Sequence, residues 1–183
     1  MEEEAKGYSI ELPLSDESRE RLRVKLSEVE GPWQKKKFTP HLSFAVIREP
    51  TDNIEALREI VQRFAKDNGP FVIQLSSMGI FPGKRPVFTL MPAWSDKLLK
   101  AHHLVADQIS AAGILPIPYY RKSQWSPHIT IMMGRPRREV GAAMEALSRV
   151  WWPGEYELDK IELVEFHPAV KMEQIVLSGP QNR

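Results

Sequence analysis

The sequence predicts an α+β fold in which a duplicated unit forms two related lobes of a single domain, residues 1–183. Segments with the two-residue alternation of strands are separated by segments with the 3.6-residue spacing of helices. Two short strings also follow the same pattern: a histidine, an apolar residue, a hydroxyl residue and another apolar residue. They are His41-Leu42-Ser43-Phe44 and His128-Ile129-Thr130-Ile131, which lie 87 residues apart. This recurrence predicts one copy in each lobe, facing a shared groove.

Local patterns define the elements of the first half. Tyr8-Ser9-Ile10-Glu11-Leu12 alternates as a strand does, and Ser15-Asp16 then starts a charged helix that Gly31-Pro32 ends. Asp52 can cap the next helix, which has a single apolar stripe. The expected elements are a strand at 8–12, a helix at 16–30, the first motif strand at 40–47, a helix from 53 to 67, strands at 71–80 and 86–92, and a helix at 95–112.

The second half is expected to repeat this order. The stiff segment that begins at Gly113 and contains Pro116 and Pro118 is the candidate connection between the lobes, near 113–124. After it we expect the second motif strand at 126–133, a helix from Pro136 to 150, and strands at 155–166 and 173–178. Phe81-Pro82 and His167-Pro168 mark corresponding turns 86 residues apart, which agrees with the motif spacing.

Composition restricts the class of protein. The 183 residues carry a net charge of +1, so no bulk field would hold long duplex nucleic acid, although a small or terminal phosphate remains compatible. There is no cysteine, which excludes thiolate metal sites and suits a reducing cytoplasm, where we expect the protein to act. The acidic N-terminus does not resemble a signal peptide, and no apolar run is long enough to span a bilayer.

The motif pair supplies the groups that cleavage of a phosphodiester requires. In a strand, the histidine and the hydroxyl of each copy point to one face and the two apolar residues to the other. Displacement at phosphorus needs one proton acceptor, one proton donor and hydrogen-bond donors for the non-bridging oxygens. One such histidine alone is more often a structural side chain, but the duplication favours a catalytic role for both.

At these residues the chain resembles the 2H phosphoesterase superfamily, in particular its 2′-5′ RNA ligase-like and 2′,3′-cyclic phosphodiesterase branch. Phe38-Thr39-Pro40-His41-Leu42-Ser43 resembles the first family motif, and Trp125-Ser126-Pro127-His128-Ile129-Thr130 resembles the second. Ser77 to Pro82, followed by Val87 to Leu90, resembles the intervening region, and the likeness covers about residues 7–178. The first motif has Ser where many relatives have Thr, which keeps the hydroxyl.

The resemblance implies a bilobal fold with two antiparallel sheets lining a central groove and helices outside. It also implies metal-free hydrolysis of a cyclic or 2′-5′ phosphodiester without a cofactor. His41 and His128 would be the catalytic acid and base, and Ser43 and Thr130 would bind the phosphate. The expected partner is an RNA terminus or a nucleotide with a cyclic phosphate; we expect a monomer and no metal site.

For other residues near the motifs, a structural role is an alternative to a functional one. The run Tyr119 to Trp125 is aromatic and basic, so it could stack a base and attract a phosphate, with Arg121 as the preferred additional phosphate contact. The simpler interpretation is a solvated loop. His102 and His103 are adjacent on a helix and point about 100° apart, which makes a shared metal site improbable. His102 lies on the apolar stripe and is expected in the core or at its boundary.

Two other classes of protein stay open at this point. A non-catalytic module that binds RNA ends would keep the groove without turnover, although it would not need two matched proton-transfer groups. A metal-dependent phosphodiesterase would use the histidines as ligands. The sequence does not determine which histidine is the base or which phosphodiester is the natural substrate.

Overall fold

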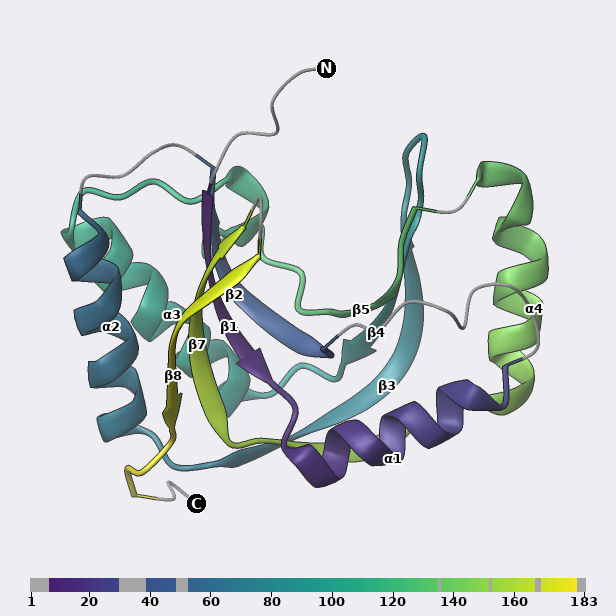
Figure 1. Ribbon diagram of the computed structural model, residues 1–183, viewed down its shortest axis with the longest axis horizontal. Helices are drawn as coiled ribbons and strands as arrows, with labels where there is room; N and C mark the ends of the chain where they lie inside the picture. The colour runs from purple at the N-terminus through teal and green to yellow at the C-terminus, as the bar shows by residue number, and fades with distance from the viewer. Residues whose placement is uncertain are drawn as a thin grey trace.

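The computed structural model describes residues 7–29, 39–48, 53–134, 136–151, 153–166 and 169–180. It is an α+β structure with antiparallel strands and helices, as the sequence predicts (Figure 1). The strands are β1 (Gly7–Pro13), β2 (His41–Ile47), β3 (Phe71–Phe81), β4 (Val87–Pro92), β5 (Ile129–Met132), β6 (Gly154–Leu158), β7 (Lys160–Phe166) and β8 (Val170–Val176). The α-helices are α1 (Asp16–Ser27), α2 (Ile54–Asp67), α3 (Asp96–Ala111) and α4 (Val140–Val150), and the 3₁₀ turns are η2 (Pro118–Tyr120) and η3 (Arg137–Glu139).

All eight strands form one sheet, in the order β6-β3-β4-β5-β2-β1-β7-β8. The expectation of two separate sheets is therefore wrong in that detail. The motif strands β2 and β5 lie side by side in the middle and are joined by the single pair Leu42–Ile129. Because the junction is so short, the two halves diverge from it as two arms (Figure 1). We call β2-β1-β7-β8 the first sheet half and β5-β4-β3-β6 the second.

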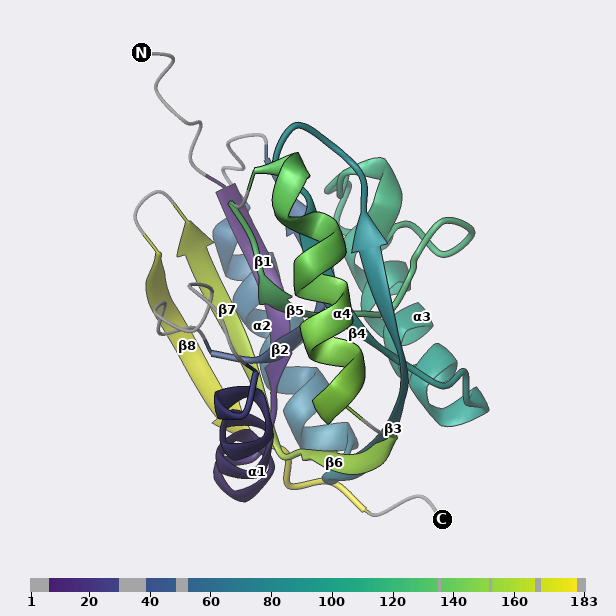
Figure 2. The ribbon, with the colours of Figure 1, turned by 90° about the vertical axis from the view of Figure 1, so that its right-hand side faces the viewer.

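The helices cover the outer face of each sheet half. Helices α2 and α3 pack on the first half, where Phe44 of β2 meets Phe64 of α2 edge-on at 5.9 Å between ring centroids. Helices α1 and α4 lie beside the second half (Figure 2). The Ser18 hydroxyl of α1 accepts a hydrogen bond from the Glu157 N–H of β6 at 2.8 Å. The opposite face of the sheet, here called the inner face, is the one that carries no helix (Figures 1 and 2).

Strand exchange between the halves was not foreseen. We expected one strand at 155–166, but Asp159 interrupts it, and β6 pairs with β3 whereas β7 pairs with β1. The order strand, helix, motif strand, helix, strand holds for residues 7–81 and again, with β6 added, for 87–166. The last strand of each run pairs with the first strand of the other, so both sheet halves contain strands from both runs.

Most other elements agree with the expected ranges within a few residues. The second motif strand is shorter than expected, 129–132, so that His128 directly precedes it. The helix expected from Pro136 begins with the η3 turn. The segment near 113–124 joins α3, which packs on the first sheet half, to β5 of the second half. It is one of several segments in which the chain passes from one sheet half to the other. Asp52 and the turn His167-Pro168 lie outside the described residues.

Candidate active site

The motif strands present their side chains as the alternation predicted. Leu42, Phe44, Ile129 and Ile131 point into the core and are at most 7% exposed. The intervening residues of each motif are only partly buried and lie on the inner face. His41 comes from the first sheet half and His128 from the start of the second, so the junction of the two halves brings the two imidazoles to one face of the molecule.

Both imidazoles are anchored in the same way. The Nδ1 atom of His41 lies 2.8 Å from the carbonyl oxygen of Thr39, and the Nδ1 atom of His128 lies 2.7 Å from that of Ser126. A carbonyl oxygen can only accept, so each Nδ1 carries a hydrogen and donates it. In the neutral ring the lone pair is then on Nε2, which is left to accept or donate a proton. The arrangement suits a pair of proton-transfer groups.

His128 has an apolar environment. The Phe81 ring packs against it nearly edge-on, with 4.6 Å between ring centroids. Burial lowers the pKa of His128, the hydrogen bond to Ser126 opposes this, and the charge of His41 lowers the pKa further. The last effect means that the two histidines are close enough to interact electrostatically. His128 is therefore biased toward the neutral form, which can accept a proton.

His41 has a carboxylate beside it instead. Oε2 of Glu11 on β1 lies 3.4 Å from Nδ1 of His41, and the Ser9 hydroxyl donates a hydrogen bond to the other carboxylate oxygen. Ser9 and Glu11 alternate in the first strand, so the sequence contained a signal for a polar face there. Which residue of β2 would lie opposite that face could not be known without the strand pairing.

Ser43 lies between Glu11 and Tyr120. Glu11 is its cross-strand partner, and Tyr120 of η2 forms a side-chain hydrogen bond with it. Burial raises the pKa of Tyr120, the hydrogen bond with Ser43 opposes this, the charge of Glu11 raises it further and that of Arg48 lowers it. These four residues therefore form one electrostatic group on the inner face of the first sheet half.

The aromatic and basic run from 119 to 125 has mixed roles. Trp125 is a packing residue: it is 5% exposed, and its Nε1 donates to the Ser43 carbonyl oxygen at 3.1 Å. Tyr119 is 74% exposed. Nε of Arg121 donates to the carbonyl oxygen of Pro116 at 3.3 Å, so part of this guanidinium is already engaged within its own loop. Arg121 stays a sequence-based candidate for phosphate contact.

Thr130 pairs across the strands with Thr89 of β4, as Ser43 pairs with Glu11 in the other half. Thr89 is 1% exposed, and its hydroxyl has no hydrogen-bond partner within the described part of the chain. A Cβ on Gly79 would lie 3.0 Å from that hydroxyl, so the glycine leaves room for it. Thr89 was not singled out by the sequence, because an isolated threonine in a strand is common.

Arg48 is the cation that sequence analysis missed. A bulge in the β1–β2 pairing makes Ile10 face Ala45 and Glu11 face Ser43, so that Phe44 is the extra residue. The bulge shifts the alternation by one, and Arg48 follows the buried Ile47 onto the inner face. Alternation counted from His41 alone would have assigned it to the opposite face.

His102 is a core residue, as expected. It is fully buried, stacks on Trp125 at 3.9 Å between ring centroids, and its Nε2 donates to the Tyr120 carbonyl oxygen at 3.2 Å. Burial lowers its pKa to about 4.

Within the described ranges, no group of three or more His, Cys, Asp or Glu side chains is placed to hold a metal ion. Among the same residues, no helix is long and apolar enough to cross a membrane.

Comparison with known families identifies the class. The family model described as the 2′-5′ RNA ligase superfamily matches residues 13–169. The chain belongs to this superfamily, and its resemblance to the 2H phosphoesterases is thereby confirmed. A search of curated protein sequences found no match.

Solved structures share the fold. A crystal structure of TT0787 from Thermus thermophilus is 19% identical over 96% of this chain and 100% of that one, with a TM-score of 0.60. E. coli LigT complexed with 3′-AMP is 14% identical over 94% of this chain and 98% of its own, with a TM-score of 0.60. Kluyveromyces marxianus Usb1 is 10% identical over 96% and 98%, with a TM-score of 0.54.

Proposed function

We propose that this protein is a metal-independent phosphodiesterase that opens 2′,3′-cyclic phosphate termini of RNA or nucleotides, acting as a cytoplasmic monomer. The observation that carries the proposal is the matched pair of imidazoles, each with Nδ1 held by a carbonyl and Nε2 left for proton transfer. Support for a nucleotide substrate comes from the family and from LigT, which has been crystallised with 3′-AMP, ATP and NADP⁺.

The reaction follows from these groups. One imidazole takes a proton from water as the water oxygen bonds to phosphorus. The bond from phosphorus to one ribose oxygen breaks, and the other imidazole, which starts protonated, gives its proton to that oxygen. Ser43, Thr130 and nearby cations, Arg48 and Arg121 among them, would stabilise the charge on the non-bridging oxygens. With a ribose hydroxyl in place of water as the nucleophile, the same ring opening would join 2′-5′ ends.

A non-catalytic module that binds RNA ends is the second candidate function. It would use the same inner face, and the exposed Tyr119 ring could stack on a base in a binding module as well as in an enzyme. The difference is the requirement for proton transfer. A binding module has no need for two imidazoles that are both anchored through Nδ1.

A substrate panel tests the proposal. Nucleoside 2′,3′-cyclic phosphates and oligonucleotides ending in a cyclic phosphate would be incubated with the protein, with and without excess chelator, and the products separated by chromatography. We expect ring opening at an unchanged rate in chelator. Binding without turnover across the panel would support the module instead. Activity lost to chelator and restored by one divalent ion would assign the histidines as metal ligands.

A further inference from the structure

Glu11 lies at the side of His41. Its side chain is 13% exposed, and Oε2 lies 3.4 Å from Nδ1 of His41. The Ser9 hydroxyl donates to Oε1, so one oxygen is fixed by the neighbouring serine while the other faces the imidazole. Strand pairing places Glu11 directly opposite Ser43 on β2 and opposite Glu162 on β7. The carboxylate thus belongs to the wall of the candidate active site.

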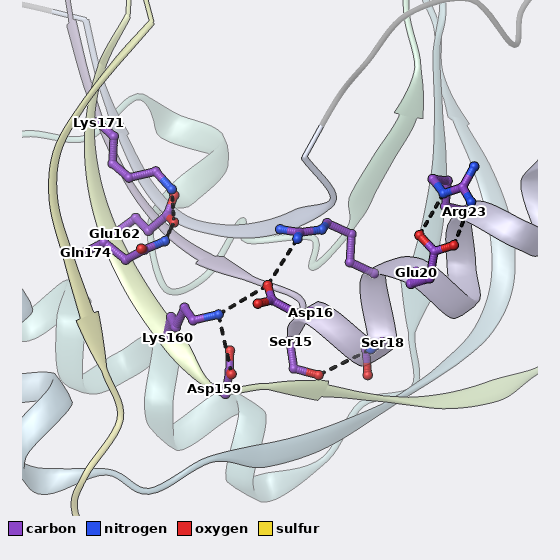
Figure 3. A network of polar contacts seen from close by, with 11 residues as sticks. Ser15, Asp16, Ser18, Glu20, Arg23, Asp159, Lys160, Glu162, Lys171 and Gln174 are labelled. Carbon is purple, nitrogen blue, oxygen red and sulfur yellow. Dashed lines mark hydrogen bonds and ion pairs between the residues drawn. The ribbon is translucent and has the colours of Figure 1, made fainter.

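The nearest carboxylate to Glu11 in the sheet, that of Glu162, is paired with other side chains. Glu162 is 3% exposed and would repel Glu11, but Lys171 Nζ lies 2.6 Å from its Oε1 and Gln174 donates a hydrogen bond to it (Figure 3). The charge of Glu162 is therefore neutralised from the side of β8. Among the described residues, the phenol of Tyr120 also lies within electrostatic range of Glu11 and of Arg48 on this part of the inner face.

The equivalent position in the second sheet half has no carboxylate. There the cross-strand partner of Thr130 is Thr89, a neutral hydroxyl. His128 packs against the Phe81 ring instead of an acidic side chain. The two motif histidines thus have the same backbone anchor and different neighbours. His41 has the charged Glu11 beside it, whereas the corresponding position in the second half holds the neutral Thr89.

We propose that Glu11 is a positioning residue that supplies a counter-charge to the His41 imidazolium, so that His41 donates the proton and His128 accepts it. A carboxylate 3.4 Å from Nδ1 stabilises the cation through its charge, while the Nδ1–H itself donates to the Thr39 carbonyl oxygen. The assignment rests on the proposed phosphodiesterase. His128 Nε2 takes the proton of the attacking water, and His41 Nε2 protonates the ribose oxygen as its bond to phosphorus breaks.

The test compares Glu11→Gln, which keeps the shape and removes the charge, with the wild type. Glu11→Asp, which keeps the negative charge on a shorter side chain, should retain part of the wild-type kcat. Glu157→Gln is the matched control, because it alters an exposed strand carboxylate of the other sheet half. With a nucleoside 2′,3′-cyclic phosphate, Glu11→Gln should lower kcat about tenfold at pH 7.5, and the alkaline limb of the pH profile should move down by about one pH unit. KM and the acidic limb should stay in place.

A second measurement does not depend on turnover. Ring ¹⁵N shifts of His41 at pH 7 report its protonated fraction, which should fall in Glu11→Gln and stay unchanged in Glu157→Gln. An unchanged fraction would overturn the role of Glu11 whatever the activity. A loss of kcat that is uniform across pH, or movement of the acidic limb, would do the same. If the wild type opens no cyclic phosphate, the proposed function fails, while the ¹⁵N result still decides whether Glu11 charges His41.

Discussion

His41 and His128 have the same backbone anchor and different neighbours. Each Nδ1 is fixed by the carbonyl two residues earlier, a contact that the string Pro-His with a preceding Thr or Ser makes possible in both motifs. The neighbours come from elsewhere in the sequence: Glu11 for one ring and Phe81 for the other. Residue type at the motif therefore determines what can transfer a proton, and the neighbours determine in which direction it moves.

Alanine variants of the motif residues should separate proton transfer from phosphate binding. His41→Ala and His128→Ala should each lower kcat by roughly two or more orders of magnitude, because each removes one proton-transfer group. Ser43→Ala and Thr130→Ala should cost less. The measurement is steady-state hydrolysis of a cyclic nucleotide, with thermal unfolding as the control for folding. Full activity in either histidine variant would remove that residue from the mechanism.

His102 makes stability depend on pH. Its pKa is lowered from 6.5 to about 4 in the folded protein, so as pH falls the unfolded chain binds the proton first. The stability is complete above pH 6.5 and is lost progressively between pH 6.5 and 4, by about 3 kcal/mol in total.

Urea unfolding at pH 7 and at pH 4 measures this effect. His102→Gln should lose less stability than the wild type between the two pH values, because its side chain does not titrate. His103→Gln, the adjacent residue on α3, is the matched control and should behave as the wild type. The same loss in wild type and His102→Gln would contradict the assignment of the effect to His102.

Among the elements, β2 shows how a small irregularity changes which side chains reach the site. The bulge at Phe44 turns both Phe44 and Ala45 toward the core, and beyond it the inner face receives Val46 and Arg48. A regular strand would have placed Arg48 on the helix-covered face, where an unpaired guanidinium is costly to bury. The bulge thus adds a positive charge to a surface that otherwise carries Glu11.

Arg48→Ala should therefore weaken substrate capture. We expect KM for an oligonucleotide with a cyclic phosphate to rise several-fold, kcat to change little, and the salt dependence of kcat/KM to become shallower. Arg121→Ala allows comparison with the cation favoured by the sequence, and Arg63→Ala on α2 is the control on the outer face. Equal effects of Arg48→Ala and Arg63→Ala would show that position on the inner face is irrelevant.

In the whole molecule, the two sheet halves are interdependent. Strands β3 and β4 lie beside β5 and β6, and β1 and β2 lie beside β7 and β8, so neither half of the chain contains a complete sheet half. The single pair Leu42–Ile129 holds the motif strands together at the centre. Exchange of strands, more than the central pair, therefore connects the two arms.

Division of the chain after the exposed Leu115 tests this interdependence. Fragments 1–115 and 116–183 should each lack cooperative unfolding, because each leaves strand edges and apolar faces without their partners. Mixed together, they should regain a cooperative transition and activity. Circular dichroism melts and two-dimensional NMR spectra measure both. A dispersed spectrum from fragment 1–115 alone would show that the first half folds independently.

The sequence by itself determined the types of most elements, the faces of the motif strands and the pairing of two histidine motifs. These depend on period and residue type, which are local. It did not determine that the expected strand at 155–166 divides at Asp159, that the two sheets are one, or that Arg48 faces inward. Alternation indicates which face a side chain occupies but not which strand lies beside it. The contacts of Glu11 with His41 and of Phe81 with His128 were therefore decided only by the tertiary structure.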